Sequence, residues 1–424
     1  MQRTRVTSRA APIRAALAAS LTLIVTACGS GSDGSTVGGA QDDADRTALA
    51  VPGRASPGSP REPIVATSTG CAPGAFHFLQ DDCVPAHSVP LDEIFSGGPP
   101  PDGIPPIDAP VYESVEDAAT WLTASSPIMV IDIDGDVRGY PLAILTWHEI
   151  VNDVVGGVPV VVTYCPLCNS ALVFERTLRT AAGDVVLDFG TSGRLYQSNL
   201  VMYDRQTRNL WTQFEGEGIV GEEHLGDRLT RLPAWLFGFD QFRELHPEAQ
   251  VLSRSTGFSR DYGRNPYVGY DADDSQPFLF RGDVDARFAP MTRMVGVTSG
   301  DEAIAVVDGL LRDERAVTLT LDAREHVVLW GPGQASALDT AAIDAGRDVG
   351  QTAVFETALD GVIVELEASG TDGVFTDGVS GSRFDLRGRA IDGPLEGRQL
   401  RAIPHDDTLW FVWVAFRPDT TVID

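Results

Sequence analysis

Residues 158–175 read VPVVVTYCPLCNSALVFE, and this stretch decides the fold class. Residues 158–164 form an apolar, β-branched run typical of a buried strand. Residues 169–175 have the composition of a second strand, so Cys165 and Cys168 are expected in a tight turn between two strands. Such a turn resembles the C-P-x-C-G knuckle of rubredoxin-like sites, and Asn169 can adopt the left-handed conformation that it requires.

From residue 111 onward, short apolar runs alternate with turns rich in Gly, Asp and Asn. Residues 128–133 and 137–140 flank Asp134-Gly135, a strong hairpin signal. The sequence therefore predicts an α+β, β-rich fold of mostly antiparallel strands, barrel- or sandwich-like, with a few short helices. Helices are expected at residues 141–152, 227–236 and 239–246, and strands at 195–203 and 408–416 among others.

The N-terminus has the features of an export signal. Four arginines precede an uncharged apolar run that ends Val25-Thr26-Ala27-Cys28. The run is too short to span a bilayer, and the small residues before Cys28 match the bacterial lipoprotein cleavage site. We expect a signal peptide at residues 1–27 and a diacylglycerol anchor on Cys28. An ordinary signal peptide that happens to contain Cys28 is the alternative.

This anchor would place the protein in the bacterial cell envelope, on the extracytoplasmic side of a membrane. Residues 28–62 are rich in Gly, Ser and Pro and predict a disordered tether. Residues 63–110 predict a proline-rich arm stapled by a disulfide, and residues 111–424 a β-rich domain.

The charge of the chain excludes some partners. It has 32 basic residues, all of them Arg, and 60 acidic residues, which gives a net charge of −28. Such an acidic surface repels phosphate backbones and anionic lipid headgroups. We therefore expect no nucleic-acid partner, and contact with the membrane through the lipid rather than through a basic patch.

The five cysteines divide by position into one lipid anchor and two pairs. Cys71 and Cys83 lie outside the cytoplasm in a segment with little core of its own, where a structural disulfide is the simplest pairing. The C-x-x-C pair of Cys165 and Cys168 can be a metal knuckle, a redox couple or a small structural disulfide.

Our first functional hypothesis is transition-metal binding by Cys165 and Cys168. Further ligands would come from His148, Met202 and His405, and His148 is the preferred one because it lies on the inner face of its predicted helix. Soft ligands outside the cytoplasm favour copper, and zinc is also possible. A core histidine and ordinary packing of Met202 and His405 are the alternatives at these positions.

Two other functions stay open at this stage. In a thiol–disulfide oxidoreductase, Cys165 would be an exposed nucleophile and Cys168 the resolving thiol. In a noncatalytic ligand-binding lipoprotein, the polar and aromatic loop at residues 260–267 would line a groove. Its candidate ligand-binding residues are Arg260, Asp261, Tyr262, Asn265 and Tyr267. Whether the protein is an enzyme is left open.

From about residue 111 to the C-terminus the chain resembles a bacterial family, the domain of unknown function numbered 3179. The resemblance rests on Gly139-Tyr140-Pro141-Leu142, His148-Glu149, Asn152-Asp153, Thr163-Tyr164-Cys165-Pro166-Leu167-Cys168, Val201-Met202-Tyr203-Asp204-Arg205-Gln206-Thr207, Leu210-Trp211, Arg260-Asp261-Tyr262-Gly263, Asn265-Pro266-Tyr267 and Trp410-Phe411-Val412-Trp413. One departure is Asn169, where many members are expected to have glycine. The resemblance implies a domain assignment rather than an activity.

Overall fold

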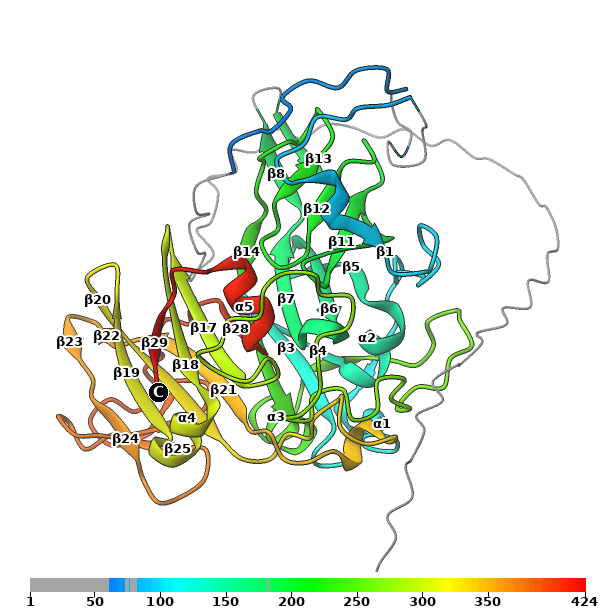
Figure 1. The fold of residues 1–424 in the computed structure, drawn as a ribbon. Helices are drawn as coiled ribbons and strands as arrows, with labels where there is room; N and C mark the ends of the chain where they lie inside the picture. Colours follow the sequence, from blue (N-terminus) through cyan, green and yellow to red (C-terminus); the bar gives the residue numbers. More distant parts are fainter. Residues whose placement is uncertain (1–60, 73–75, 77–81, 181–182) are drawn as a thin grey trace, which may run out of the picture. The chain divides into compact units, whose positions relative to one another are not determined.

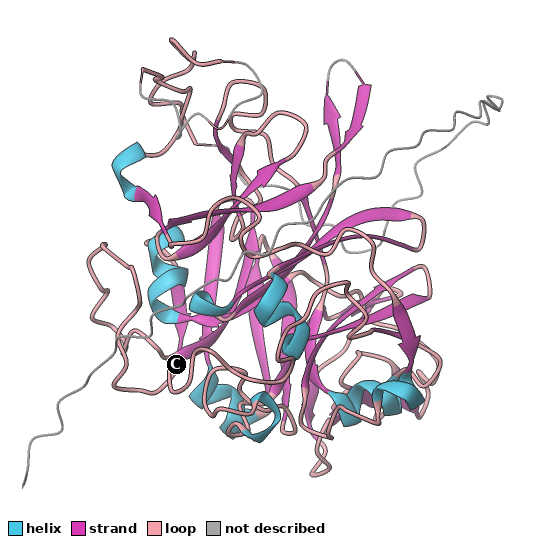
Figure 2. Cartoon of the chain, turned by 90° about the vertical axis from the view of Figure 1, so that its right-hand side faces the viewer, coloured by secondary structure: helices cyan, strands magenta, loops and turns pink. Residues whose placement is uncertain are grey.

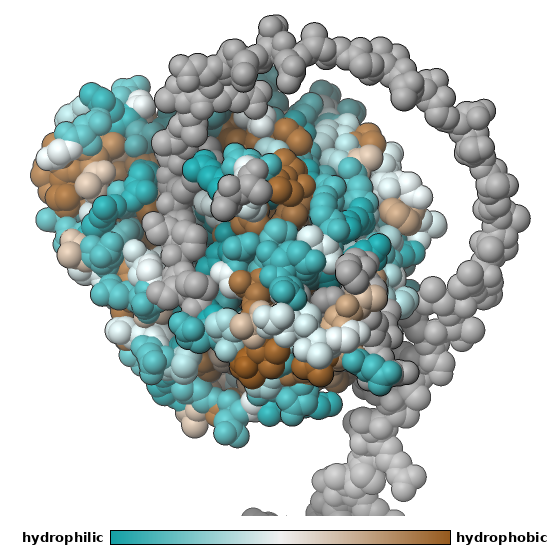
Figure 3. Space-filling model, turned by 90° about the horizontal axis from the view of Figure 1, so that it is seen from above, coloured by the Kyte–Doolittle hydropathy of each residue, from teal (hydrophilic) through white to brown (hydrophobic). Residues whose placement is uncertain are grey.

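The computed structural model describes residues 61–72, 76, 82–180 and 183–424 (Figure 1). Strands make up 42% of the described residues and helices 12%, and the sheets are mostly antiparallel with a half-barrel, which confirms the predicted fold class (Figure 2). The expected signal peptide, Cys28 and residues 28–60 of the expected tether lie outside the described residues. On the face shown in Figure 3, hydrophilic residues are interspersed with smaller hydrophobic patches.

The sheet that carries the cysteines has the strand order β14-β7-β6-β5. Its strands are β5 (Ile150–Val155), β6 (Val158–Cys165), β7 (Ser170–Glu175) and β14 (Thr230–Leu232). The strands β6 and β7 pair antiparallel with Cys165 opposite Ser170, and the 3₁₀ turn η3 (Pro166–Cys168) joins them. The predicted strand, turn and strand are therefore confirmed.

Two further sheets belong to the first half of the domain. One has the order β15-β3-β4-β16-β2, and the other β1-β10-β11-β12-β13. Their strands are β15 (Trp235–Gly238), β3 (Pro127–Ile133), β4 (Asp136–Pro141), β16 (Gln250–Leu252), β2 (Tyr112–Ser114), β1 (Ile94–Ser96), β10 (Phe189–Tyr196), β11 (Asn199–Asp204), β12 (Leu210–Thr212) and β13 (Gly218–Val220). The hairpin at Asp134-Gly135 is confirmed, and β1 joins the expected arm to the domain by pairing with β10.

The C-terminal half adds a sheet of order β28-β17-β18-β29 and a sheet of order β19-β20-β21. These strands are β28 (His405–Leu409), β17 (Arg293–Ser299), β18 (Glu302–Val307), β29 (Thr421–Ile423), β19 (Ala316–Leu321), β20 (Arg324–Gly331) and β21 (Gln351–Glu356). Smaller sheets contain β8 (Thr177–Thr180), β9 (Gly183–Val186), β22 (Ala358–Leu359), β23 (Val362–Ile363), β24 (Leu366–Ala368), β25 (Val374–Asp377), β26 (Arg383–Asp385) and β27 (Ala390–Asp392). The described helices are α1 (Val115–Ala118), α2 (Leu142–His148), α3 (Phe239–Leu245), α4 (Asp308–Glu314) and α5 (Trp410–Phe416).

Four local predictions were wrong. The helix expected over residues 141–152 ends at His148, because Glu149 is left-handed with a φ of 58° and β5 begins at once. Residues 227–236 form strands rather than a helix, and residues 195–203 form a hairpin. The strand expected over 408–416 is mostly helix α5, whose uninterrupted apolar run looks the same in a buried helix and a buried strand.

The hydrophobic core that matters for function contains both cysteines. Helix α5 contributes Trp410, Phe411 and Trp413 to it, and β11 contributes Met202. No helix among the described residues combines the length and the hydrophobicity that a membrane crossing requires.

Candidate dithiol site

Cys165 and Cys168 are two free thiols at the end of the β6–β7 hairpin, with their Sγ atoms 3.4 Å apart. Pro166 opens the 3₁₀ turn, and Asn169 closes it in the expected left-handed conformation, with a φ of 50°. Cys165 is 2% exposed and Cys168 is fully buried. The site therefore brings two reduced sulfur atoms together inside the core.

Strand β28, some 240 residues further along the chain, holds the turn in place. The Thr408 hydroxyl donates to the carbonyl oxygen of Cys168 at 2.9 Å, and the Asn169 side-chain amide donates to the carbonyl of Asp407 at 3.4 Å. The Tyr164 hydroxyl donates to the Asn169 side-chain oxygen at 3.4 Å. These bonds order the turn without engaging either sulfur atom.

Polar groups from the β10–β11 hairpin contact the Cys168 sulfur. The Asn199 amide donates to Sγ at 3.5 Å, and the thiol donates to the carbonyl of Ser198 at 3.5 Å. Asn199 is itself fixed, because its amide also donates to Gln213 at 2.7 Å and its oxygen accepts from the Phe214 backbone at 3.0 Å. An N–H group directed at sulfur stabilises a thiolate, so the contact with Asn199 favours the ionised form of Cys168.

Burial opposes the ionisation of both Cys168 and Glu149, and at Cys168 it outweighs the Asn199 contact. It raises the pKa of the Cys168 thiol well above its ordinary value and raises the pKa of Glu149 to about 8. Glu149 is 8% exposed, and its carboxyl group has no hydrogen-bond partner among the residues that the structure describes. Its backbone carbonyl accepts from Tyr164 at 2.8 Å, which places Glu149 beside the strand end that carries Cys165.

The segment at residues 253–292 packs against the core that contains the pair. It runs from the end of β16 to the start of β17 and contains no helix or strand. Its residues Tyr267, Tyr270 and Phe280 pack against the core that contains both cysteines, and the Ser198 hydroxyl donates to the carbonyl of Phe278 at 2.5 Å. Loops of this length without secondary structure are uncommon in compact domains, and those that are ordered are often functional; we name this one the cover segment.

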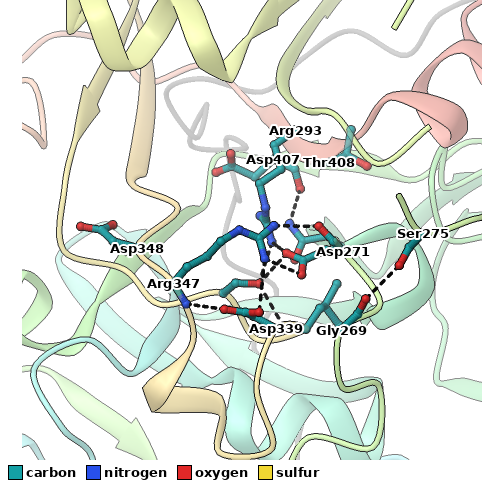
Figure 4. A network of polar contacts seen from close by, with 12 residues as sticks. Gly269, Asp271, Ser275, Arg293, Asp339, Arg347, Asp348, Asp407 and Thr408 are labelled. Atoms are coloured by element: carbon teal, nitrogen blue, oxygen red, sulfur yellow. Dashed lines mark hydrogen bonds and ion pairs between the residues drawn. The ribbon is translucent and has the colours of Figure 1, made fainter. Parts of the chain in front are cut away.

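Asp271 ties the cover segment to the C-terminal half of the domain (Figure 4). Its carboxylate is buried and accepts from Arg293 at 2.7 Å, from Arg347 at 2.9 Å and from Ser336 at 2.6 Å. Burial works against the charge, but Arg293 and Ser336 outweigh it and lower the pKa of Asp271. The cover segment is thus held by a buried ion-pair network.

The structure does not bring the expected histidine ligands to the sulfur atoms. The ring nitrogens of His148 lie 2.7 Å from the Pro105 carbonyl and 2.7 Å from the Tyr262 hydroxyl. His405 Nδ1 lies 3.1 Å from the carbonyl of Ile403, and burial lowers the pKa of this ring to about 4. Met202 shares the core of the cysteines. Within the described ranges, no group of three or more His, Cys, Asp or Glu side chains could hold a metal ion.

The five residues predicted to bind a ligand do not gather at one site. Asp261 and Tyr262 line a cavity of about 640 Å³, whereas Tyr267 packs against the hydrophobic core that contains the cysteines. Asn265 is buried and holds the loop by donating to the Thr340 carbonyl at 3.0 Å. Arg260 is exposed, with one bond of 3.3 Å to the Ser259 carbonyl.

Sequence reasoning missed Glu149, Asn199 and Tyr270 as neighbours of the pair. Glu149 stands next to His148, but the predicted helix ran past it and concealed its left-handed conformation. The remaining pair behaves as expected, since Cys71 and Cys83 form a disulfide.

Residues 101–420 match a protein family described as "Protein of unknown function (DUF3179)". The chain belongs to this family. No curated protein and no solved structure matches the chain significantly. Since the family's description gives no activity, the chemistry of the site has to be argued from its geometry.

Proposed function

We propose that this protein is a cell-envelope lipoprotein in which Cys165 and Cys168 form a reversible dithiol–disulfide couple. The observation that carries the proposal is the 3.4 Å separation of two free Sγ atoms on one tight turn. A disulfide bond is about 2.0 Å long, so the sulfur atoms need to approach by only about 1.4 Å.

The substrate class is a disulfide. The Cys165 thiolate attacks one sulfur of the substrate, the substrate S–S bond breaks, and the released thiolate takes up a proton. The Cys168 thiolate then attacks the Cys165 sulfur of the mixed disulfide, and the second substrate thiol leaves. Two electrons pass to the substrate, which becomes two thiols, while the protein acquires the Cys165–Cys168 disulfide; the reverse sequence oxidises a dithiol substrate.

Cys165 is assigned as the nucleophile because it is the less enclosed of the two. Cys168 is fully buried and held by Asn199 and Ser198, which suits a resolving thiol. The exposed Cys165 that an oxidoreductase was expected to have is not found, since this thiol is buried as well. Exchange with a substrate therefore requires the cover segment to move.

Transition-metal binding by the same pair is the second candidate. The observation that favours it is the knuckle geometry, in which Pro166 and the left-handed Asn169 bring both sulfur atoms to one side of the turn. Copper is preferred and zinc possible, and His148 would have to leave Pro105 and Tyr262 to become a ligand. The membrane anchor on Cys28 belongs to both proposals and supplies the compartment in which the pair works.

One experiment separates the two candidates. The purified protein is equilibrated with mixtures of reduced and oxidised glutathione, its free thiols are trapped by alkylation, and the alkylated mass is measured beside the metal content. We expect a single two-electron transition in the wild type, lost in Cys165→Ser and in Cys168→Ser, with less than stoichiometric copper or zinc. Thiols that stay reduced at every ratio, together with one metal ion per chain lost in both variants, would favour the metal site instead.

A further inference from the structure

A cavity of about 640 Å³ lies between three parts of the chain and is separate from the cysteines. Its volume falls within the range of sites for small organic ligands. The walls come from the end of α1 and the start of β3, from the cover segment, and from the loop that contains η4 (Ile343–Ala345). The buried side chains of Leu122, Ala143 and Ile343 give it an apolar floor.

The positively charged side chain of Arg254 lines this cavity. The Arg254 guanidinium lies 4.7 Å from the ring centre of Trp121, and the Trp121 indole N–H is anchored by a 2.6 Å hydrogen bond to Glu113. Arg254 has no carboxylate partner within the described part of the chain. Stacking thus orients a guanidinium without neutralising it, in a protein of net charge −28 that has carboxylates in excess.

The other charges around the cavity balance Arg254. Arg264 and Asp261 are each 70% exposed and form only a loose pair at 3.7 Å. The Asp344 carboxylate has no hydrogen bond or ion pair to any residue that the structure describes, while its backbone is held by a 2.9 Å bond from Ser125. Two guanidinium groups and two carboxylates therefore line the cavity, with one free group of each sign.

We propose that this cavity binds a short peptide with free termini and an apolar side chain. The peptide carboxylate would pair with Arg254, its ammonium group with Asp344, and its side chain would lie on the apolar floor. A neutral saccharide would leave both charges unpaired, and a simple anion would leave Asp344 unpaired. This inference does not depend on the dithiol chemistry.

Four dileucine ligands test the proposal by calorimetric titration of the intact protein. They are Leu-Leu with free ends, its N-acetyl form, its C-terminal amide and the doubly blocked form. The variants are Arg254→Gln and Asp344→Asn. Arg243→Gln on α3 is the control, because the Arg243 side chain is half exposed and, among the described residues, pairs only with Asp240 on the same helix.

We expect saturable binding of Leu-Leu and a loss of about tenfold in affinity for each blocked end. Arg254→Gln should weaken the carboxylate ligands by a similar factor and leave the amides unchanged. Asp344→Asn should do the same for the ammonium ligands, and Arg243→Gln should change nothing.

Equal affinities of the wild type for the free and doubly blocked peptides would overturn the proposal, and so would the absence of saturable binding. Because this comparison uses only the wild type, the result stands even where a variant folds poorly.

Discussion

At the scale of single residues, two non-glycine residues of the site adopt the left-handed backbone conformation, which most side chains avoid. Asn169 and Glu149 both have a positive φ without being glycine, which costs a side chain about 1–2 kcal/mol. Asn169 offsets this cost with its bonds to Asp407 and Tyr164. Glu149 has no such bond among the described residues, and its left-handed conformation turns a carboxyl group into the core.

Glu149→Gln should change the dependence of stability on pH. Burial raises the pKa of Glu149 from 4.5 to about 8, so the folded state favours the protonated form. Its contribution is complete below pH 4.5 and is lost as the pH rises through 8, at up to about 1.4 kcal/mol per pH unit. The free energy of unfolding in urea, measured at about pH 5 and about pH 8, should fall less in Glu149→Gln than in the wild type. Equal falls in both proteins would contradict the assignment; Asp407, whose pKa burial raises to about 6, contributes to both.

Asn169→Ala should destabilise the protein by about 1–2 kcal/mol, because alanine retains the strain of the left-handed conformation and loses both side-chain bonds. Asn169→Gly should cost less, because glycine removes that strain. Urea unfolding of the three proteins gives the order. The interpretation fails if alanine and glycine are equally tolerated.

At the scale of elements, the position of α5 on β17 shapes the core behind the cysteines. Gly296 on β17 lies under the indole ring of Trp413, and a Cβ atom at this position would lie 2.1 Å from that ring. The helix can therefore approach the sheet only over a residue without a side chain. The apolar run of residues 410–416 does not indicate this contact. The segment was predicted as a strand because such a run looks the same in a buried helix and in a buried strand.

Gly296→Ala should lower the free energy of unfolding by about 1–3 kcal/mol or more through overpacking. Gly309→Ala in α4 is a matched control, since its Cβ would meet nothing within 4 Å and alanine favours the helix. Thermal unfolding followed by circular dichroism compares the two. A loss in Gly309→Ala as large as that in Gly296→Ala would show that the clash with Trp413 is not the cause.

At the scale of the whole molecule, the two halves of the domain meet at the dithiol. The hairpin with the cysteines belongs to the first half, whereas Thr408, Arg293 and Arg347 belong to the second. Asp271 connects the cover segment to that second half through a buried network. We therefore expect access to the sulfur atoms to depend on ion pairs that lie far from them in sequence.

Asp271→Asn should release the cover segment, because it leaves Arg293 and Arg347 without their buried carboxylate. Breaking such a pair from one side costs about 3–5 kcal/mol. Under native conditions Cys165 and Cys168 should react with an alkylating reagent at least about tenfold faster than in the wild type. Asp240→Asn, at an exposed pair on α3, is the control. Unchanged alkylation in a folded Asp271→Asn protein would exclude the cover segment as the barrier.

The sequence by itself determined the parts that local patterns encode. The β-branched run before Cys165, the Asp134-Gly135 turn and the left-handed tolerance of Asn169 each act within a few residues, so the hairpins and the thiol turn could be predicted. The spacing and setting of Cys71 and Cys83 were enough to predict their disulfide.

Only the tertiary structure decided what surrounds the thiols. Glu149, Asn199 and Tyr270 come from three separate segments of the chain, and Thr408 lies 240 positions from Cys168, so no local pattern predicts their convergence. For the same reason, His148 proved to be bound by Pro105 and Tyr262, and the cavity beside Arg254 was not foreseen. Contacts between residues so far apart in sequence form only when the whole chain packs, so they depend on the tertiary structure.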